Sequence, residues 1–199
     1  MSDAKADILA RVRAALGPSP ALRDVPRAYR SAGSIPRDGV VELFCERVAE
    51  YRANVHRTDD AAATVRSILA GAARVGVPPG FPDLGIDAIA DDRLSIAELD
   101  SLDAVVTGAA LAIAETGTIV LDSGPESGRR ALTLVPDHHV CIVRAGSIVP
   151  SVPDAIAALD PARPITFVSG PSATSDIELD RVEGVHGPRT LDVIVLAGT

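Results

Sequence analysis

One stretch near the end of the chain carries most of the side chains that could do chemistry. Residues 169–178 read SGPSATSDIE, and residues 184–189 follow as GVHGPR. Hydroxyls, carboxylates, an imidazole and a guanidinium are thus held between glycines and prolines, in the kind of loop where rigid scaffolds place binding and catalytic groups. If Ser175 or Asp176 opens a helical turn, its unpaired backbone N–H groups would favour an anion.

We therefore expect this stretch to bind a small anion, either a carboxylate or a phosphate. Arg189 follows a Gly-Pro turn and is a candidate bidentate clamp for a carboxylate. The other candidate ligand contacts offer hydroxyls, close backbone approach, carboxylates or an imidazole: Gly170, Ser172, Thr174, Asp176, Glu178 and His186. The alternative is purely structural, because serine and aspartate in such loops commonly form turns and caps.

A second polar turn lies earlier in the chain. Glu115 ends the apolar run 111–114 and precedes Thr116, Gly117 and Thr118. Ligand crevices of α/β sheets lie at the carboxyl ends of strands, so Glu115 is a candidate catalytic residue and the next three are candidate ligand contacts. Three roles for Glu115 stay open: a nucleophile supported by nearby donors, a ligand contact, or an acceptor of backbone hydrogen bonds in a hairpin turn.

Two adjacent histidines, His138 and His139, invite comparison with metal sites. In an extended segment their side chains point to opposite faces, so both cannot easily reach one ion. We expect local hydrogen bonds at a strand entrance and no metal site, although one of the two could face the ligand, and we include His138 among the ligand-binding candidates. Arg129 and Arg130 could attract an acidic ligand, or could lie on a solvated face.

Apolar periodicity and capping residues predict the elements that must position these groups. Runs such as residues 192–196 do not alternate, which indicates strands covered on both faces, and their mixture with helices indicates a layered α/β domain. We expect an N-terminal helix (3–16) and a Pro-rich arm in residues 1–37, then one α/β domain in residues 38–199. Within that domain we expect helices at 38–53, 60–69, 95 onward and 152–159, and strands at 54–58, 74–77, within 82–93, 103–107, 109–114, 118–122, 140–143, 165–168 and 191–196.

Composition argues against several functions. The net charge is −8 and there are three Phe, two Tyr and no Trp, so the chain lacks the basic surface and stacking platforms of nucleic-acid binders. It has two cysteines, whereas a standard iron–sulfur cluster needs about four thiolates, so we expect no cofactor on this chain. We find no apolar run long enough for a membrane span and no secretory signal, and we expect a cytoplasmic protein.

Two segments resemble the signatures of a known family. Residues 107–121, TGAALAIAETGTIVL, and residues 170–178 with 184–188, GPSATSDIE and GVHGP, are similar to the two signatures of the LUD-domain family. Residues 136–139 lie between them in the family's order, and the resemblance covers roughly residues 38–197. It implies a fold similar to the NagB/RpiA/CoA-transferase class, with a mostly parallel sheet and helices on both faces.

The resemblance also implies a place in a system that oxidises L-lactate to pyruvate with iron–sulfur subunits. The clusters would then belong to partner subunits, and this chain would be a component without a cluster. Two alternatives remain open. One is a stand-alone enzyme of the CoA-transferase or sugar-phosphate-isomerase kind, in which Glu115 would resemble the acyl-accepting glutamate of CoA-transferases. The other is a non-catalytic scaffold whose N-terminal helix and arm dock the partners.

Overall fold

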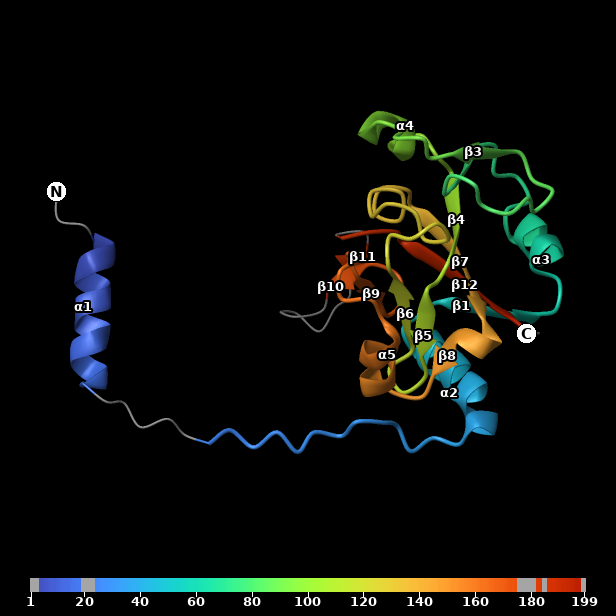
Figure 1. Ribbon diagram of the computed structural model, residues 1–199. Coiled ribbons are helices and arrows are strands. Elements are labelled where there is room, and N and C mark those ends of the chain that lie inside the picture. Colours follow the sequence, from blue (N-terminus) through green and yellow to red (C-terminus); the bar gives the residue numbers. More distant parts are fainter. Residues whose placement is uncertain (1–3, 19–23, 175–181, 184–185, 198–199) are drawn as a thin grey trace. The chain divides into compact units, whose positions relative to one another are not determined.

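The computed structural model describes residues 4–18, 24–174, 182–183 and 186–197 (Figure 1). The chain divides into two units, Met1–Arg30 and Ser31–Thr199. The first unit contains helix α1 (Ala4–Leu16), which matches the predicted helix and has no buried residue. The helix ends before Gly17, whose φ is +73°. A glycine in this left-handed conformation commonly terminates a helix.

The core of the second unit is a six-stranded sheet in which every neighbouring pair is parallel. Its spatial order is β1-β12-β7-β4-β2-β3. The prediction of an α/β fold with a mostly parallel sheet is therefore confirmed. The strands are β1 (Asn54–Thr58), β2 (Val75–Val77), β3 (Ala88–Ala90), β4 (Ala104–Gly108), β7 (His138–Arg144) and β12 (Thr190–Leu196).

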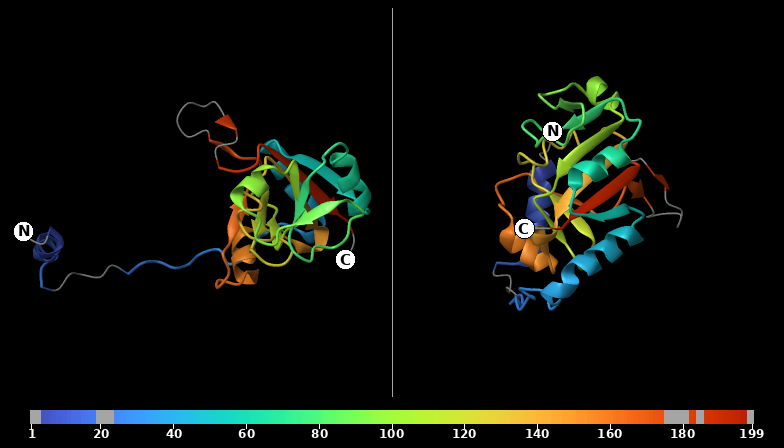
Figure 2. Two further views of the ribbon diagram at one scale, coloured as in Figure 1. Left: turned by 90° about the horizontal axis from the view of Figure 1, so that it is seen from above. Right: turned by 90° about the vertical axis from the view of Figure 1, so that its right-hand side faces the viewer.

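Both faces of this sheet are covered, which explains the continuous apolar runs of its central strands. On one face Val140 and Ile142 pack in a cluster with Val65 of helix α3 (Ala61–Ile68). On the other face Cys141 and Val143 pack in a cluster with Phe44 of helix α2 (Arg37–Glu50). The two helices lie on different sides of the sheet, so the expectation of helices on both faces is also confirmed (Figure 2).

A second, four-stranded sheet shares the α2 face. Its order is β8-β5-β6-β9, built around the antiparallel hairpin of β5 and β6. Helix α5 (Val152–Ala158) covers its other side, where Ala155 packs against Leu111, Ile113 and Val120. The sequence predicts three of these strands but not their separation into a sheet of their own. The strands are β5 (Leu111–Ile113), β6 (Thr118–Leu121), β8 (Ile148–Val149) and β9 (Thr166–Val168).

Local signals set most element boundaries. The side chain of Asp60 accepts a hydrogen bond from the Ala63 N–H and caps α3, and Ser95 forms the expected capping box with Glu98 at the start of α4 (Ile96–Asp100). Besides β8, three short elements are not predicted: the 3₁₀ turn η1 (Ala145–Ser147) and the antiparallel pair β10 (Ala173–Thr174) and β11 (Val182–Glu183). No helix in the described ranges is long and apolar enough to cross a membrane.

Candidate functional site

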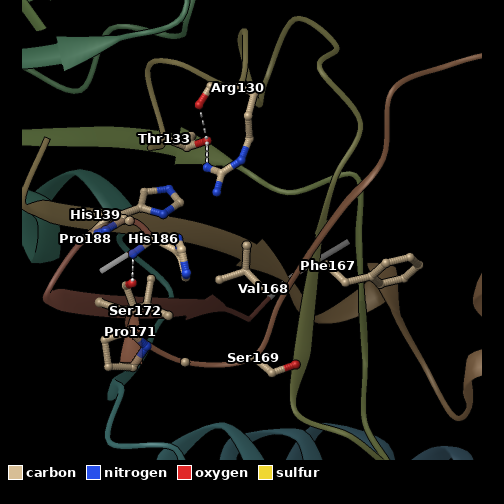
Figure 3. A pocket seen from close by; sticks show the side chains of 13 residues that line it. Arg130, Thr133, His139, Phe167, Val168, Ser169, Pro171, Ser172, His186 and Pro188 are labelled. Carbon is tan, nitrogen blue, oxygen red and sulfur yellow. Dashed lines mark hydrogen bonds between the residues drawn. The ribbon is translucent and has the colours of Figure 1, made fainter. Parts of the chain in front are cut away.

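A pocket of about 200 Å³ lies at the amino ends of β7 and β12, on the face of the sheet that α2 covers (Figure 3). Its walls come from four segments that are far apart in the sequence. These are Arg130 and Thr133 before β7, His139 at the start of β7, residues 167–172 at and after β9, and residues 186–188 with Leu191 leading into β12.

The polar stretch predicted from the sequence closes this pocket because its two limbs are tied together. The Ser172 N–H donates to the Pro188 carbonyl at 2.8 Å, and the His186 N–H donates to Ser172 Oγ at 2.8 Å. The limb from β9 and the limb into β12 therefore run side by side over the start of the sheet. Gly170, Ser172 and His186, three of the predicted contacts, all line the pocket.

Gly170 is required where the first limb passes α2. Its φ is +98°, and a Cβ there would lie 2.5 Å from the Cβ of Tyr51. Since real Cβ atoms do not approach so closely, a side chain at this position would push the limb away from the end of α2. The glycine thus fixes one wall of the pocket.

Arg130 supplies the positive charge of the pocket. Its Nη1 donates to Thr133 Oγ1 at 3.0 Å, and in the part of the chain that the structure describes no carboxylate forms an ion pair with it. Burial lowers the pKa of Arg130, yet an arginine remains charged at any physiological pH. Its neighbour differs: Arg129 donates from Nε and Nη2 to the two carboxylate oxygens of buried Asp91, each at 2.6 Å. Arg129 is therefore structural, whereas Arg130 presents its guanidinium to the pocket.

His139 lies beside this charge and is neutral. Its Nε2 is 2.8 Å from Thr107 Oγ1, and 2% of the residue is exposed. Burial, and after it the positive charge of Arg130, lowers the pKa of His139 to about 3. Figure 3 shows the Arg130 guanidinium and the His139 ring on the same side of the pocket. Thr107 engages one ring nitrogen of His139, and among the described residues the other ring nitrogen makes no hydrogen bond.

His138 points to the opposite face, as the alternation of an extended chain requires. Its Nε2 lies 2.7 Å from one carboxylate oxygen of Asp192, and Nε2 of His56 lies 2.6 Å from the other. Burial alone would raise the pKa of Asp192, but hydrogen bonds from His138 and His56 bring it below its usual value. The predicted contact His138 is thus placed outside the pocket, and its neighbour His139 lines it instead. Within the described ranges no three His, Cys, Asp or Glu side chains form a group that could hold a metal ion.

Glu115 also lies outside the pocket lining. Its Oε1 accepts a hydrogen bond of 2.9 Å from the N–H of Val152, at the start of α5. The turn that follows it is a hairpin turn, with Gly117 at a φ of +58°. This geometry matches the structural interpretation of Glu115, as an acceptor of backbone hydrogen bonds.

The two polar turns nevertheless meet through their hydroxyls. Thr116 Oγ1 lies 2.8 Å from Thr118 Oγ1, which lies 2.7 Å from Oγ of Ser169 at the pocket wall. Thr116 and Thr118 therefore support the pocket through Ser169 and do not line it. Gly117 packs against α2, where a Cβ would lie 2.6 Å from the backbone of Arg47 and of Val48.

The remaining predicted contacts are placed elsewhere or not described. Arg189 is 62% exposed, and its Nε donates to both carboxylate oxygens of Asp137 at 2.7 Å. The side chain of Thr174, in β10, lies outside the description, as do Asp176 and Glu178 altogether. The clamp expected from Arg189 is therefore engaged with a carboxylate of the chain itself.

The position of the pocket differs from the expectation of a crevice at the carboxyl ends of the strands. A hollow of about 160 Å³ does lie there, beside Gly108 and Ile142, but its walls are mostly apolar and its Arg144 pairs with Glu126 at 2.6 Å. The polar pocket forms at the amino ends because the second sheet delivers the limb after β9 to that edge. The rule for open α/β sheets does not anticipate an additional sheet.

Among the polar side chains that line the pocket, Arg130, Thr133 and His139 were not among the predicted ligand contacts. For Arg130 and His139 the sequence did contain a signal. The pair Arg129-Arg130 was recognised as a possible attraction for an acidic ligand, and the strand alternation showed that only one histidine could face the site. Which arginine pairs with Asp91, and which histidine faces inward, depends on contacts 32 to 38 residues away in the chain.

The sequence and the fold of this chain are similar to those of known proteins. The model of the LUD domain matches residues 87–196. Lactate utilization protein C of Deinococcus radiodurans is 42% identical over 207 residues, covering 98% of this chain and 96% of that protein. Lactate utilization protein C of Bacillus subtilis is 35% identical over 102 residues, covering 47% of this chain and 42% of that protein. The crystal structure of a DUF162 family protein from Deinococcus radiodurans superposes with a TM-score of 0.69 at 38% identity, covering 82% of this chain and 99% of that one.

Proposed function

Because this chain belongs to the LUD-domain family, we propose that it is a component of a lactate-utilisation system that oxidises L-lactate to pyruvate, and that its pocket binds a small anion. The family match over residues 87–196 and the 42% identity to a protein named for lactate utilization support the first part. The chemistry of the pocket supports the second.

We further propose that the electron-transferring clusters of this system reside in partner subunits. The chain has two cysteines, Cys45 and Cys141, and both are buried. Burial raises the pKa of the Cys141 thiol to about 12 and also raises that of Cys45, so neither offers the thiolate that a cluster needs. A cytoplasmic location belongs to the same proposal, and cell fractionation would test it.

The observation that carries the anion site is the environment of Arg130. This guanidinium is half-buried at the pocket wall and, among the described residues, bonded to a neutral hydroxyl rather than to a carboxylate. A charged hydrogen bond contributes about 1.5–3 kcal/mol. An anion entering the pocket would gain such bonds in a site that Val168 and Leu191 partly shield from water.

Growth on L-lactate tests the role and the pocket together. Deletion of the gene should abolish growth on L-lactate and leave growth on glucose unchanged. The unaltered gene should restore lactate growth, whereas Arg130→Gln should restore it poorly, because losing a charged hydrogen bond weakens anion binding about 10- to 100-fold. Arg47→Gln is the matched control, since among the described residues the Arg47 side chain pairs only with Glu50 and it does not line the pocket. Normal lactate growth of the deletion strain would refute the role, and full rescue by Arg130→Gln would refute the pocket.

The N-terminal unit is our candidate for contact with the partners. Ile8, Val12 and Leu16 follow helical spacing along α1, and each is about half exposed. Apolar side chains arranged in this way are typical of a helix that binds another protein. We propose that α1 and the arm dock the iron–sulfur subunits.

A further inference from the structure

The ligand of the pocket can be specified more closely, and this inference rests on the proposed function. We propose that the pocket takes a short monocarboxylate with a hydroxyl or keto oxygen on the carbon next to the carboxylate, and that it discriminates against phosphate.

The charge of the pocket fits an ion with one negative charge. Among the described residues that line the pocket, Arg130 is the one whose positive charge is fixed, and no carboxylate of these ranges neutralises it. Two histidines also line the pocket: His139 is buried and stays neutral because its pKa is about 3, whereas His186 is exposed to water. A dianionic phosphate would therefore enter with one charge uncompensated, which is costly in a partly buried site.

Backbone N–H groups do not compensate the second negative charge of phosphate in this pocket. Phosphate sites usually add a row of backbone N–H groups or the start of a helix. Here the N–H of Ser172 is taken by the Pro188 carbonyl, and the N–H of His186 is taken by Ser172 Oγ. No helix of the described part of the chain begins at the pocket wall.

Two neutral groups of the pocket wall, His139 and Ser172, can bind a second oxygen of the ligand. Among the described residues His139 makes its hydrogen bond through Nε2, to Thr107, so Nδ1 remains available. Ser172 Oγ accepts the His186 N–H, so its own hydroxyl hydrogen can still be donated. A hydroxyl can donate to or accept from such groups and a keto oxygen can accept, whereas a methylene group can do neither.

The size and the apolar walls limit the rest of the ligand. Since a cavity of about 150 Å³ can hold benzene, a pocket of about 200 Å³ has room for a ligand of about six heavy atoms. Val168, Pro171 and Leu191 provide apolar surface for a methyl-sized group. A three-carbon hydroxy or keto acid has these dimensions and this polarity.

Calorimetry on the purified full chain at pH 7 and constant ionic strength tests this inference. The probes are L-lactate, pyruvate, propionate and inorganic phosphate. Propionate is matched to lactate except for the hydroxyl. We expect lactate or pyruvate to bind about 10-fold more tightly than propionate, the value of one hydrogen bond of about 1.4 kcal/mol, and inorganic phosphate to bind more weakly than either.

Variants separate the two contributions. Ser172→Ala should reduce the difference between lactate and propionate, Arg130→Gln should abolish binding of all the acids, and Arg47→Gln should leave every affinity unchanged. Thermal unfolding of each variant checks that the fold is retained.

Three results would overturn the inference: propionate binding as tightly as lactate and pyruvate, phosphate binding more tightly than the acids, or no binding of any probe at millimolar concentration. Each is distinguishable from failure of the proposed function. If the deletion strain cannot grow on lactate, the proposed role in lactate utilisation stands, even if phosphate binds the pocket more tightly than the acids. Conversely, the purified chain could bind lactate selectively while the deletion strain grows normally on lactate. That result would support the proposed ligand class and refute the role in lactate utilisation.

Discussion

Two adjacent histidines occupy opposite environments in this fold. His139 is buried and neutral beside Arg130, whereas His138 shares the Asp192 carboxylate with His56. The alternation of an extended chain predicts this divergence. It does not predict which residue faces the ligand, because that depends on which face of β7 receives the limb after β9. The candidates Gly170, Ser172 and His186 could be predicted because turn chemistry is local, whereas Arg130 required knowledge of the partner of Arg129.

The neutral state of His139 should appear in the pH dependence of stability. Its pKa is about 3 in the folded chain and about 6.5 when unfolded, so between these values the unfolded chain binds the additional proton. Stability must therefore fall as the pH is lowered from 6.5 towards 3. At pH 5 this amounts to a loss of about 2 kcal/mol relative to pH 7. Urea unfolding at both pH values measures it.

A variant assigns this dependence to one residue. His139→Asn should lose about 2 kcal/mol less than the wild type between pH 7 and pH 5. An unchanged dependence in His139→Asn would show that the imidazole is not buried as a neutral group.

At the scale of elements, the sequence predicts the helices and the strands of the parallel sheet well, because caps and apolar runs are local signals. Asp60 and Ser95 cap α3 and α4 at the positions where these helices are predicted to begin. The separation of β5, β6, β8 and β9 into a second sheet was not predicted. Residues 109–122 show no composition that distinguishes one sheet from another, and the pairing of β6 with β9 joins residues about 45 positions apart. The pocket lies where these two sheets meet, so its position could not be predicted either.

The packing of the β5–β6 turn on α2 provides a test at this scale. Gly117→Ala would place a Cβ 2.6 Å from the backbone of Arg47 and of Val48, at a positive φ. We expect the free energy of unfolding to fall by about 2–4 kcal/mol, through strain and overpacking. Gly146→Ala is the control, because a Cβ there meets nothing within 4 Å and the change should stay within about 0.5 kcal/mol. Equal effects in urea unfolding would contradict the close contact of the turn with α2.

For the molecule as a whole, the family resemblance predicted from two short signatures is confirmed by the match over residues 87–196. These signatures are informative because they include the residues whose backbone conformation is demanding, such as Gly117 and Gly170. The predicted boundary between arm and domain, at residues 37 and 38, was drawn from the prolines, the few apolar clusters before it and the expected start of a helix at residue 38. In the structure residues 31–36 already contact the domain, since the Gly33 N–H donates to Asp154 Oδ2 at 2.9 Å.

Removal of residues 1–30 separates folding from assembly. The remaining unit, Ser31–Thr199, contains every cluster of the hydrophobic core. We therefore expect its melting temperature to change by less than about 2 °C. Co-purification of the iron–sulfur partners should be lost, because the exposed apolar side of α1 is gone. A large drop in melting temperature would contradict independent folding of residues 31–199. Unchanged co-purification would contradict partner binding by residues 1–30.

The place of β12 in the sheet has a consequence for biosynthesis. Residues 190–196 insert between β1 and β7, which are made long before them. Until β12 has been synthesised, the backbone N–H and C=O groups at the edges of β1 and β7 that will pair with it remain unpaired. These edges can then pair with wrong strands. Completion of the sheet must therefore wait until residues 190–196 have been synthesised, so the partly made chain exposes the edges of β1 and β7 until then.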